Sequence, residues 1–266
     1  MDWFQALVLA ILQGLTEFLP ISSSAHLVIP SLVLDWPDQG LAFDVSVHVG
    51  TLAAVIAYYR NDLRKIATAW LHSLGGAPSS NDSRMVWYLL LASTPAGLVG
   101  VLQGDFIEAH ARNLPVIATT TLLFGLLLGY ADRHAEGTPR YRSLNIGVAM
   151  FIGLAQAFAP IPGVSRSGVT ITAALLLNLS RQDAARFSFL LSIPVITGAG
   201  IVKGWSLVQA DTAVDWALMG GAALMSALTA YACISVFLRL LDRVGMMPFV
   251  YYRIVLAALL YGIWLA

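Results

Sequence analysis

Charged residues are scarce in this chain, since Asp, Glu, Lys and Arg make up only 11% of its 266 residues. A soluble domain carries roughly a quarter. The 15 basic and 15 acidic residues cancel, so the basic excess of a nucleic-acid-binding protein is missing. The single cysteine, Cys233, cannot form an internal disulfide, and core packing is its expected role. The start, Met1-Asp2-Trp3, lacks the basic region of a signal peptide, so we expect the whole chain to be mature and inserted in a membrane.

Apolar residues dominate instead, at 58%, and they form runs of two lengths. A helix that crosses a bilayer needs about 20 residues, whereas runs of roughly 10–14 are more often re-entrant or buried. Six runs are predicted to span: Leu41–Tyr59, Met85–Gln103, Leu114–Ala131, Phe187–Lys203, Ala213–Leu238 and Pro248–Leu265. Four are too short: Trp3–Thr16, Ser24–Leu34, Leu144–Ala159 and Val169–Leu179. We expect loops over residues 60–84 and Asp105–Arg112, and a polar linker over Asp132–Arg142.

The short runs come in two pairs at equivalent places in the chain, each pair joined at a proline. The shared features are an amide, a proline and a serine at nearly the same spacing, in Gln13, Pro20 and Ser23 of the first pair and Gln156, Pro162 and Ser165 of the second. Chance similarity between apolar sequences is the alternative. Two proline-broken short segments in two halves favour an inverted repeat with a site at its interface.

The predicted fold is therefore an all-α integral membrane protein with six transmembrane helices plus two re-entrant helix-loop-helix hairpins in an inverted-topology repeat. We expect a single membrane domain over residues 1–266. The first repeat covers about 1–131 with its hairpin at 3–34, and the second covers about 144–265 with its hairpin at 144–179.

The basic residues favour one orientation of this arrangement. With the N-terminus outside, the predicted cytoplasmic loops hold Arg60, Arg64, Lys65, Arg84, Arg133, Arg140, Arg142, Arg181, Arg186, Arg239 and Arg243. Only Arg112 and Lys203 lie outside, as the positive-inside rule requires. The first hairpin then enters from outside and the second from inside, as expected of an inverted repeat.

The loop of the first hairpin, which we call the first elbow, is unusually polar for its apolar surroundings. Polar groups at membrane depth are costly and usually mark a site. Pro20 ends one helix, and Ser22, Ser23 or Ser24 can cap the next, whose free N–H groups then form an anion site. Gln13 and Glu17 share a helix face, and His26 could approach Glu17 from the second helix.

The second elbow carries Arg166 between Ser165 and Ser167, followed by Gly168. If the two elbows meet, a carboxylate, an imidazole, a guanidinium and several hydroxyls converge. Arginine binds phosphate through two N–H groups. A carboxylate and an amide, with substrate oxygens, suit Mg²⁺ or Ca²⁺, and a serine beside a histidine base is a nucleophile arrangement. The combination indicates phosphoryl chemistry on a lipid-borne substrate.

Three motifs carry a specific resemblance: Gln13-x-x-x-Glu17, Pro20-Ile-Ser-Ser-Ser-Ala-His26 and Pro162-Gly-Val-Ser-Arg-Ser-Gly168. They resemble the signature motifs of the undecaprenyl-diphosphate phosphatase family of the bacitracin-resistance type. Length and hydropathy fit along the whole chain, including the closing Pro248-Phe-Val-Tyr-Tyr-Arg253. The first motif of that family is Glu or Gln, three residues, then Glu, so Gln13 is an allowed variant. It nevertheless weakens a metal site made of two carboxylates.

The resemblance implies hydrolysis of undecaprenyl diphosphate to undecaprenyl phosphate and inorganic phosphate, which recycles the lipid carrier for peptidoglycan synthesis and confers bacitracin resistance. It also implies a divalent cation, Mg²⁺ or Ca²⁺, and a place in the bacterial cytoplasmic (inner) membrane with the site open to the external face. The expected partners are the lipid substrate and the bilayer, with no nucleic acid, and a homodimer is one option for the assembly. The assigned residues are Glu17, Ser23, His26 and Arg166 for catalysis, Ser22, Ser24, Ser165, Ser167, Gly168 and Arg253 for phosphate binding, and Gln13 with Glu17 for the metal.

Other interpretations stay open at this point. A transporter or flippase for a prenyl phosphate lipid would use the same broken helices and anion site, and a non-catalytic scaffold would leave the Glu, His and Arg groups unexplained. The serines could serve only as helix caps, and Arg166 could extend to the membrane interface. Arg253 could equally be an interfacial anchor, and His48 could form a helix-packing hydrogen bond. The nucleophile could be Ser23, His26 or water.

Overall fold

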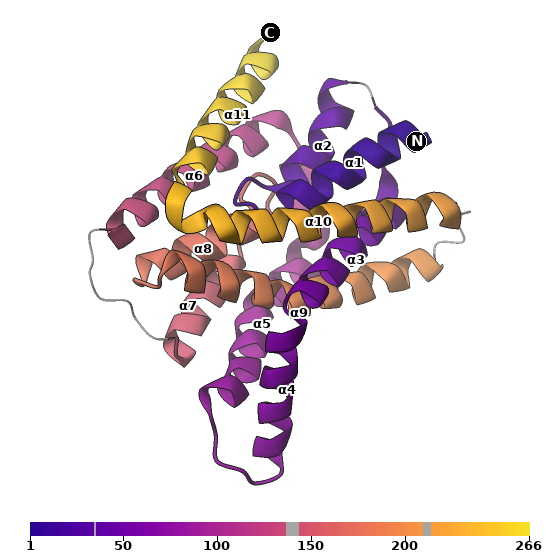
Figure 1. The fold of residues 1–266 in the computed structure, drawn as a ribbon. Coiled ribbons are helices and arrows are strands. Elements are labelled where there is room, and N and C mark those ends of the chain that lie inside the picture. The colour runs from indigo at the N-terminus through magenta and orange to yellow at the C-terminus, as the bar shows by residue number, and fades with distance from the viewer. Residues whose placement is uncertain (35, 137–143, 210–213) are drawn as a thin grey trace.

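The computed structural model describes residues 1–34, 36–136, 144–209 and 214–266, which form eleven helices (Figure 1). In chain order these are α1 (Trp3–Thr16), α2 (Ser23–Val33), α3 (Gly40–Tyr58), α4 (Arg60–Leu74), α5 (Asn81–Ala111), α6 (Leu114–Glu136), α7 (Ile146–Gln156), α8 (Arg166–Leu176), α9 (Arg181–Gln209), α10 (Trp216–Val244) and α11 (Met247–Leu265).

Six helices are long and apolar enough to cross a bilayer: α3, α5, α6, α9, α10 and α11. They correspond one by one to the six predicted spans. Large apolar side chains such as Leu98 and Leu102 on α5 are exposed on their surfaces, where lipid would cover them. The fold is that of a multi-pass, all-helical membrane protein, as the sequence predicted.

Several polar segments that were expected to be loops are helical. Helix α4 occupies most of the loop predicted at 60–84, because Leu63, Ile66 and Trp70 recur at helical spacing and let it pack on α5. Trp70 and Trp87 meet edge to face, with ring centroids 5.8 Å apart. Figure 1 shows α4 and α5 projecting together as a hairpin.

Two further loop predictions differ from the structure, the second of them only in part. Helix α5 continues through the loop predicted at Asp105–Arg112 and ends at Ala111, and α6 runs into the predicted linker as far as Glu136. The remainder of that linker, residues 137–143 with Arg140 and Arg142, lies outside the described residues, as does Ala213 at the start of a predicted span.

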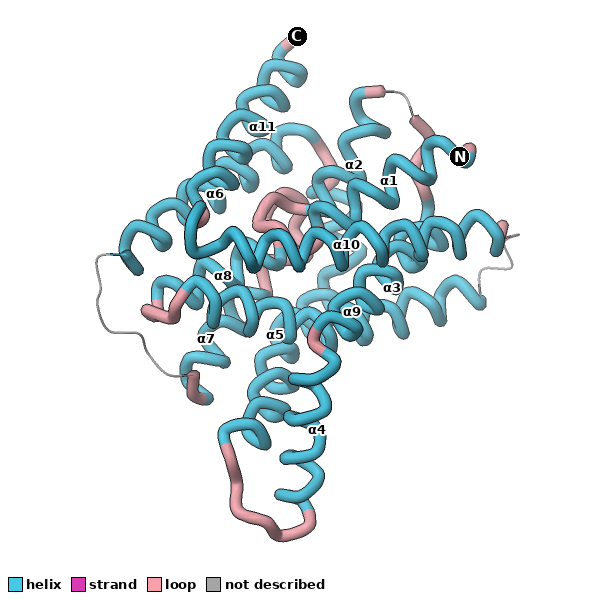
Figure 2. Tube along the Cα trace, in the orientation of Figure 1, coloured by secondary structure: helices cyan, strands magenta, loops and turns pink. Residues whose placement is uncertain are grey.

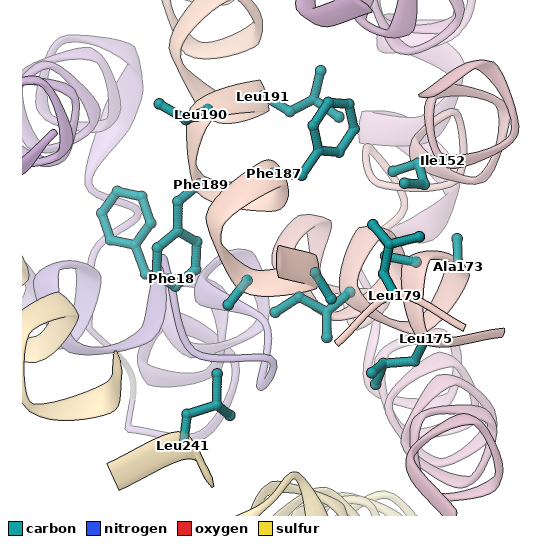
Figure 3. Close-up of a cluster of buried hydrophobic side chains, with 14 of the residues drawn as sticks. Phe18, Ile152, Ala173, Leu175, Leu179, Phe187, Phe189, Leu190, Leu191 and Leu241 are labelled. Carbon is teal, nitrogen blue, oxygen red and sulfur yellow. The ribbon is translucent and has the colours of Figure 1, made fainter. Parts of the chain in front are cut away.

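The largest hydrophobic core surrounds α9, which contacts α3, α5, α8 and α10. Phe18, from the first elbow, packs edge to face on Phe189 with centroids 5.1 Å apart. Figure 3 shows Phe187, Leu190 and Leu191 in the same cluster, next to α8 residues. This core fixes the first elbow against α9, although the two are far apart in sequence.

Two glycines let the short helices approach long ones from the other half of the chain. A Cβ on Gly14 would lie 2.7 Å from the Ser226 carbonyl oxygen, so α1 sits directly on the α10 backbone. A Cβ on Gly153 would lie 2.5 Å from the Ala92 carbonyl oxygen, which places α7 equally close to α5. Any larger residue at either position would force the helices apart.

The short helices bring their connecting loops together at the centre of the molecule, where Figure 2 draws loop segments among α1, α2, α8 and α10. The Ser22 hydroxyl accepts a hydrogen bond from the Gly163 N–H at 3.2 Å. The Ser167 hydroxyl donates to the Leu19 carbonyl at 2.9 Å. The expectation that the two elbows meet is confirmed.

Candidate active site

The first elbow turns sharply at Ser22, whose φ of 75° is rare for a residue with a side chain. The Ser22 hydroxyl caps α2 by accepting from the Ala25 N–H at 3.4 Å. It also lies 3.2 Å from the Ser24 hydroxyl. Backbone strain of this kind is concentrated at functional sites, where the surrounding structure holds it in place.

The second elbow repeats this conformation at Ser165, where φ is 72°. The Ser165 hydroxyl caps α8 by accepting from the Gly168 N–H at 3.0 Å, and it lies 3.2 Å from the Ser167 hydroxyl. Ser22, Ser165, Ser167 and Gly168 are all buried. These four predicted phosphate contacts therefore build the elbows, whereas Ser24 is exposed and Ser23 is partly exposed.

Glu17 is the hub of the contacts between the elbows, although its side chain is only 6% exposed. Its Oε1 accepts from Arg166 Nη2 at 2.9 Å. Its Oε2 accepts from the Ser23 hydroxyl at 2.7 Å and from Gln13 Nε2 at 3.0 Å. A buried carboxylate is tolerated only when paired and hydrogen-bonded in this way, and the sequence analysis expected this carboxylate and this guanidinium to converge if the elbows met.

Arg166 begins α8 and is held on two sides. Besides Glu17, its guanidinium donates from Nη1 to the Ser188 carbonyl on α9 at 3.0 Å. Its Cζ lies 5.8 Å from the centroid of the Phe18 ring, within the range of a cation–π contact. The guanidinium points into the protein at Glu17, so the alternative that it extends to the membrane interface is wrong.

His48 lies closer to the site than the sequence indicated. Its Nε2 is 3.8 Å from Glu17 Oε2, and its Nδ1 is 2.7 Å from the Asp44 carbonyl oxygen. Since a carbonyl only accepts, Nδ1 carries a proton and Nε2 faces the carboxylate. The Asp44 carbonyl belongs to the same helix, so this contact is not a hydrogen bond between packed helices, and the other edge of the ring borders Glu17 of the first elbow.

Both ring nitrogens of His26 have partners other than Ser23. Its Nδ1 lies 2.7 Å from the Ser22 carbonyl oxygen and its Nε2 lies 2.6 Å from the Tyr252 hydroxyl. The Ser23 hydroxyl donates to Glu17 instead. Sequence reasoning missed Tyr252, because a contact between residues 226 positions apart leaves no local signal; its place beside Arg253 in the closing motif was the only indication.

Arg253 is fully buried at 0% exposure, so the alternative of an interfacial anchor is wrong. Its guanidinium holds both elbows and α6 together through backbone carbonyls. The acceptors are Thr121 from Nε (3.0 Å), Pro20 (3.1 Å) and Val164 (3.2 Å) from Nη1, and Gly163 (2.8 Å), Val164 (3.2 Å) and Thr120 (3.4 Å) from Nη2. All three nitrogens are thus occupied by backbone, and phosphate binding by Arg253 stays a prediction.

The oxygen ligands present can be compared with what a divalent cation needs. Among the described residues, no three His, Cys, Asp or Glu side chains gather where they could hold a metal. Gln13 and Glu17 nevertheless offer an amide and a carboxylate side by side, and Gln13 Oε1 is buried with no partner in the described part of the chain. Hard cations accept such oxygens together with waters and phosphate oxygens. The pair supplies the kind of oxygens that a cation shared with a phosphate substrate would need, although Gln13 here faces Glu17 with its Nε2; the metal site stays a prediction.

Comparison with known proteins gives a consistent result along the chain. The family model described as "Bacitracin resistance protein BacA" matches residues 6–259. The undecaprenyl-diphosphatase of Teredinibacter turnerae is 56% identical over 98% of this chain and 99% of its own length. Those of Saccharophagus degradans and Alcanivorax borkumensis are 52% and 55% identical over the whole of both chains. The chain therefore belongs to the bacitracin resistance protein BacA family.

Proposed function

We propose that this protein hydrolyses undecaprenyl diphosphate to undecaprenyl phosphate and inorganic phosphate, which recycles the lipid carrier for peptidoglycan synthesis and confers resistance to bacitracin. The observation that carries the proposal is the contact of Glu17 with both Arg166 and the Ser23 hydroxyl, at 2.9 and 2.7 Å. It places a cation, a proton acceptor and a hydroxyl around one point. Relatives 50–56% identical bear the name of this activity.

The first step uses these three groups. Arg166 turns one edge of its guanidinium from Glu17 to the terminal phosphate, and the N–H groups at the start of α2 neutralise further charge. Ser23 Oγ attacks the terminal phosphorus while its proton passes to Glu17 Oε2. The Oγ–P bond forms, the bond from phosphorus to the bridging oxygen breaks, and undecaprenyl phosphate leaves with the electron pair.

In the second step, water attacks the phosphorus of the phosphoserine. The bond from the water oxygen to phosphorus forms, the Oγ–P bond breaks, Glu17 returns its proton to Ser23 Oγ, and inorganic phosphate is released. Glu17 rather than His26 takes the first proton in this scheme, because the Ser23 hydroxyl contacts the carboxylate and both His26 nitrogens have other partners. Direct attack by water that Ser23 positions is the competing route.

Purified protein in detergent micelles tests this proposal. We expect it to release phosphate from undecaprenyl diphosphate without any membrane gradient, and substrate labelled in the terminal phosphate to label Ser23 transiently. Absence of release would leave a carrier of prenyl phosphate lipids as the function. Release without labelling of wild-type protein, even after rapid acid quench, would favour direct attack by water.

A divalent cation, Mg²⁺ or Ca²⁺, belongs to the same proposal. Gln13 and Glu17 would hold it, and it would supply positive charge against the phosphate oxygens. We expect chelation with EDTA to reduce phosphate release by about 100-fold, on the order expected for loss of a charge-stabilising group. Added Mg²⁺ or Ca²⁺ should restore the rate. Undiminished turnover in protein dialysed against EDTA would contradict a cation site here.

For the membrane arrangement, we propose two re-entrant hairpins, α1–α2 and α7–α8, in an inverted-topology repeat. At 1.5 Å per residue, 11 to 14 residues reach only about 16–21 Å, short of the roughly 30 Å hydrocarbon core. The repeat is supported by the matching conformations at Ser22 and Ser165. It is also supported by the packing of α1 on α10 and of α7 on α5, each across the two halves.

The membrane is the cytoplasmic (inner) membrane, with the N-terminus and the site facing the periplasm. Lipid covers the exposed apolar faces of the long helices in this arrangement, so no face is assigned to a homodimer.

Cysteine labelling in a Cys233→Ser background tests the orientation. Cysteines placed at Asp2 and Asp38, on either side of the first hairpin, should react with an impermeant reagent applied to intact cells. Cysteines at Asn61, Arg133 and Asp183 should react only after the membrane is opened, because these three positions lie on the predicted cytoplasmic face. Arg133 and Asp183 flank the second hairpin there. The reverse labelling pattern would refute the proposed orientation.

A further inference from the structure

Tyr252 is tied to His26 by two contacts that the mechanism above does not use. The Tyr252 hydroxyl oxygen lies 2.6 Å from His26 Nε2. The two rings are nearly parallel, with an interplanar angle of 15° and centroids 5.7 Å apart. The phenol therefore meets the imidazole at its edge, with the two ring planes nearly parallel.

The other nitrogen of His26 defines what the phenol does. The Ser22 carbonyl, 2.7 Å from Nδ1, can only accept, so Nδ1 carries a proton. In the neutral imidazole the remaining nitrogen, Nε2, then has a free electron pair and accepts from the Tyr252 hydroxyl. The partner of one ring nitrogen thus fixes the protonation of the other.

Helix α11 holds Tyr252 in a fixed place relative to the first elbow. The next residue, Arg253, is fully buried and donates to the Pro20 carbonyl of that elbow and the Val164 carbonyl of the second. The Tyr252 backbone is therefore anchored to the same loops that carry the site. Tyr252 is 43% exposed, whereas His26 is 8% exposed, so the phenol is the more accessible of the two rings.

We propose that Tyr252 is a positioning residue for hydrolysis, which holds the neutral His26 ring with Nδ1 on the Ser22 carbonyl and presents Nε2 as a proton acceptor. When substrate binds, Nε2 gives up the hydrogen bond from the Tyr252 hydroxyl. In the second step it then accepts a proton from the attacking water. Tyr252 acts on the reaction only through His26. This inference rests on the proposed phosphatase function.

Tyr252→Phe tests the proposal, because it removes the hydroxyl and keeps the aromatic ring beside His26. The matched control is Tyr251→Phe, since the neighbouring tyrosine is 58% exposed and on the same helix. We expect Tyr252→Phe to lower kcat by about tenfold, the effect of one well-placed hydrogen bond. The KM of Tyr252→Phe should stay within about twofold of wild type, because uniform binding is not affected. Tyr251→Phe should match wild type in both constants.

Two further measurements separate positioning from a purely structural effect. In His26→Ala protein, adding Tyr252→Phe should cause no further loss of kcat, since residues that act as a unit are non-additive. The second measurement is the ¹⁵N NMR signal of His26 Nε2 in protein labelled at its five histidines. This unprotonated signal is assigned by its absence in His26→Ala. It should shift in Tyr252→Phe and stay in place in Tyr251→Phe.

Wild-type kcat in Tyr252→Phe would overturn the proposal. So would an equal additional loss in the His26→Ala background, or an Nε2 signal that does not move. Failure of the phosphatase function itself would show differently, as absence of phosphate release by the wild-type protein.

Discussion

Glu17→Gln should reduce phosphate release by about 10³-fold or more, on the scale seen when a charged catalytic group is removed. The amide retains the size of the side chain, but it cannot take the Ser23 proton and no longer balances the charge of Arg166. The substitution also removes the only acidic residue in either elbow.

Initial rates on undecaprenyl diphosphate in micelles, together with the melting temperature, would separate lost chemistry from unfolding. The melting temperature should also fall, because the single amide oxygen can accept from Arg166 or from Ser23 but not from both, and because Arg166 loses its counter-ion; the rates are therefore compared well below the melting temperature of the variant. Glu17→Ala should be equally inactive.

Glu108→Gln provides the matched control. Glu108 also pairs with an arginine, Arg112, at 3.1 Å, but both side chains lie at the surface of α5 and its C-terminal end. Exposed pairs of this kind contribute little, so the rate should stay within about twofold of wild type. Wild-type turnover in Glu17→Gln would contradict the assignment of Glu17 as proton acceptor and hub of the site.

The elbows could be predicted from the sequence because their signals are local. Pro20 and Pro162 interrupt apolar helical runs, and a serine follows each at the distance needed to cap the next helix. The predicted first helix, Trp3–Thr16, has the boundaries found in the structure. Helix α4 was missed because its charged residues indicated a loop, whereas its apolar residues recur with the period of a helix.

The contacts of Arg253 and Tyr252 could not be predicted, because they depend on how α11 packs against elbows more than 85 residues away in the chain. From sequence, a buried arginine and a phosphate-binding arginine look alike, and only the positions of the surrounding carbonyls distinguish them. The pairing of Glu17 with Arg166 could be anticipated, since a lone guanidinium at membrane depth needs a counter-ion and the first elbow offers a single carboxylate.

Arg166→Lys should reduce kcat by about 100-fold, although it keeps the positive charge. The guanidinium reaches Glu17 Oε1 with Nη2 and the Ser188 carbonyl with Nη1, at 2.9 and 3.0 Å. One ammonium group cannot hold both and still offer a planar pair of donors to phosphate, and loss of one such donor costs about 10²–10³ in rate. Arg186→Lys is the control, since Arg186 pairs with Asp62 at 2.9 Å and its side chain is 40% exposed. That variant should retain nearly full activity.

Combining Arg166→Lys with Glu17→Gln then tests whether the two elbows act on one phosphate. Groups in direct contact, acting as a unit, lose much less together than the product of their separate losses. We therefore expect the double variant to be only slightly slower than Glu17→Gln alone, when both are measured at saturating substrate. Fully multiplicative losses would mean that Arg166 and Glu17 contribute independently, and near-normal activity in Arg166→Lys would assign its guanidinium to structure alone. The non-additive result would place residues 149 positions apart in a single catalytic unit, because the two side chains are paired with each other until the substrate phosphate comes between them.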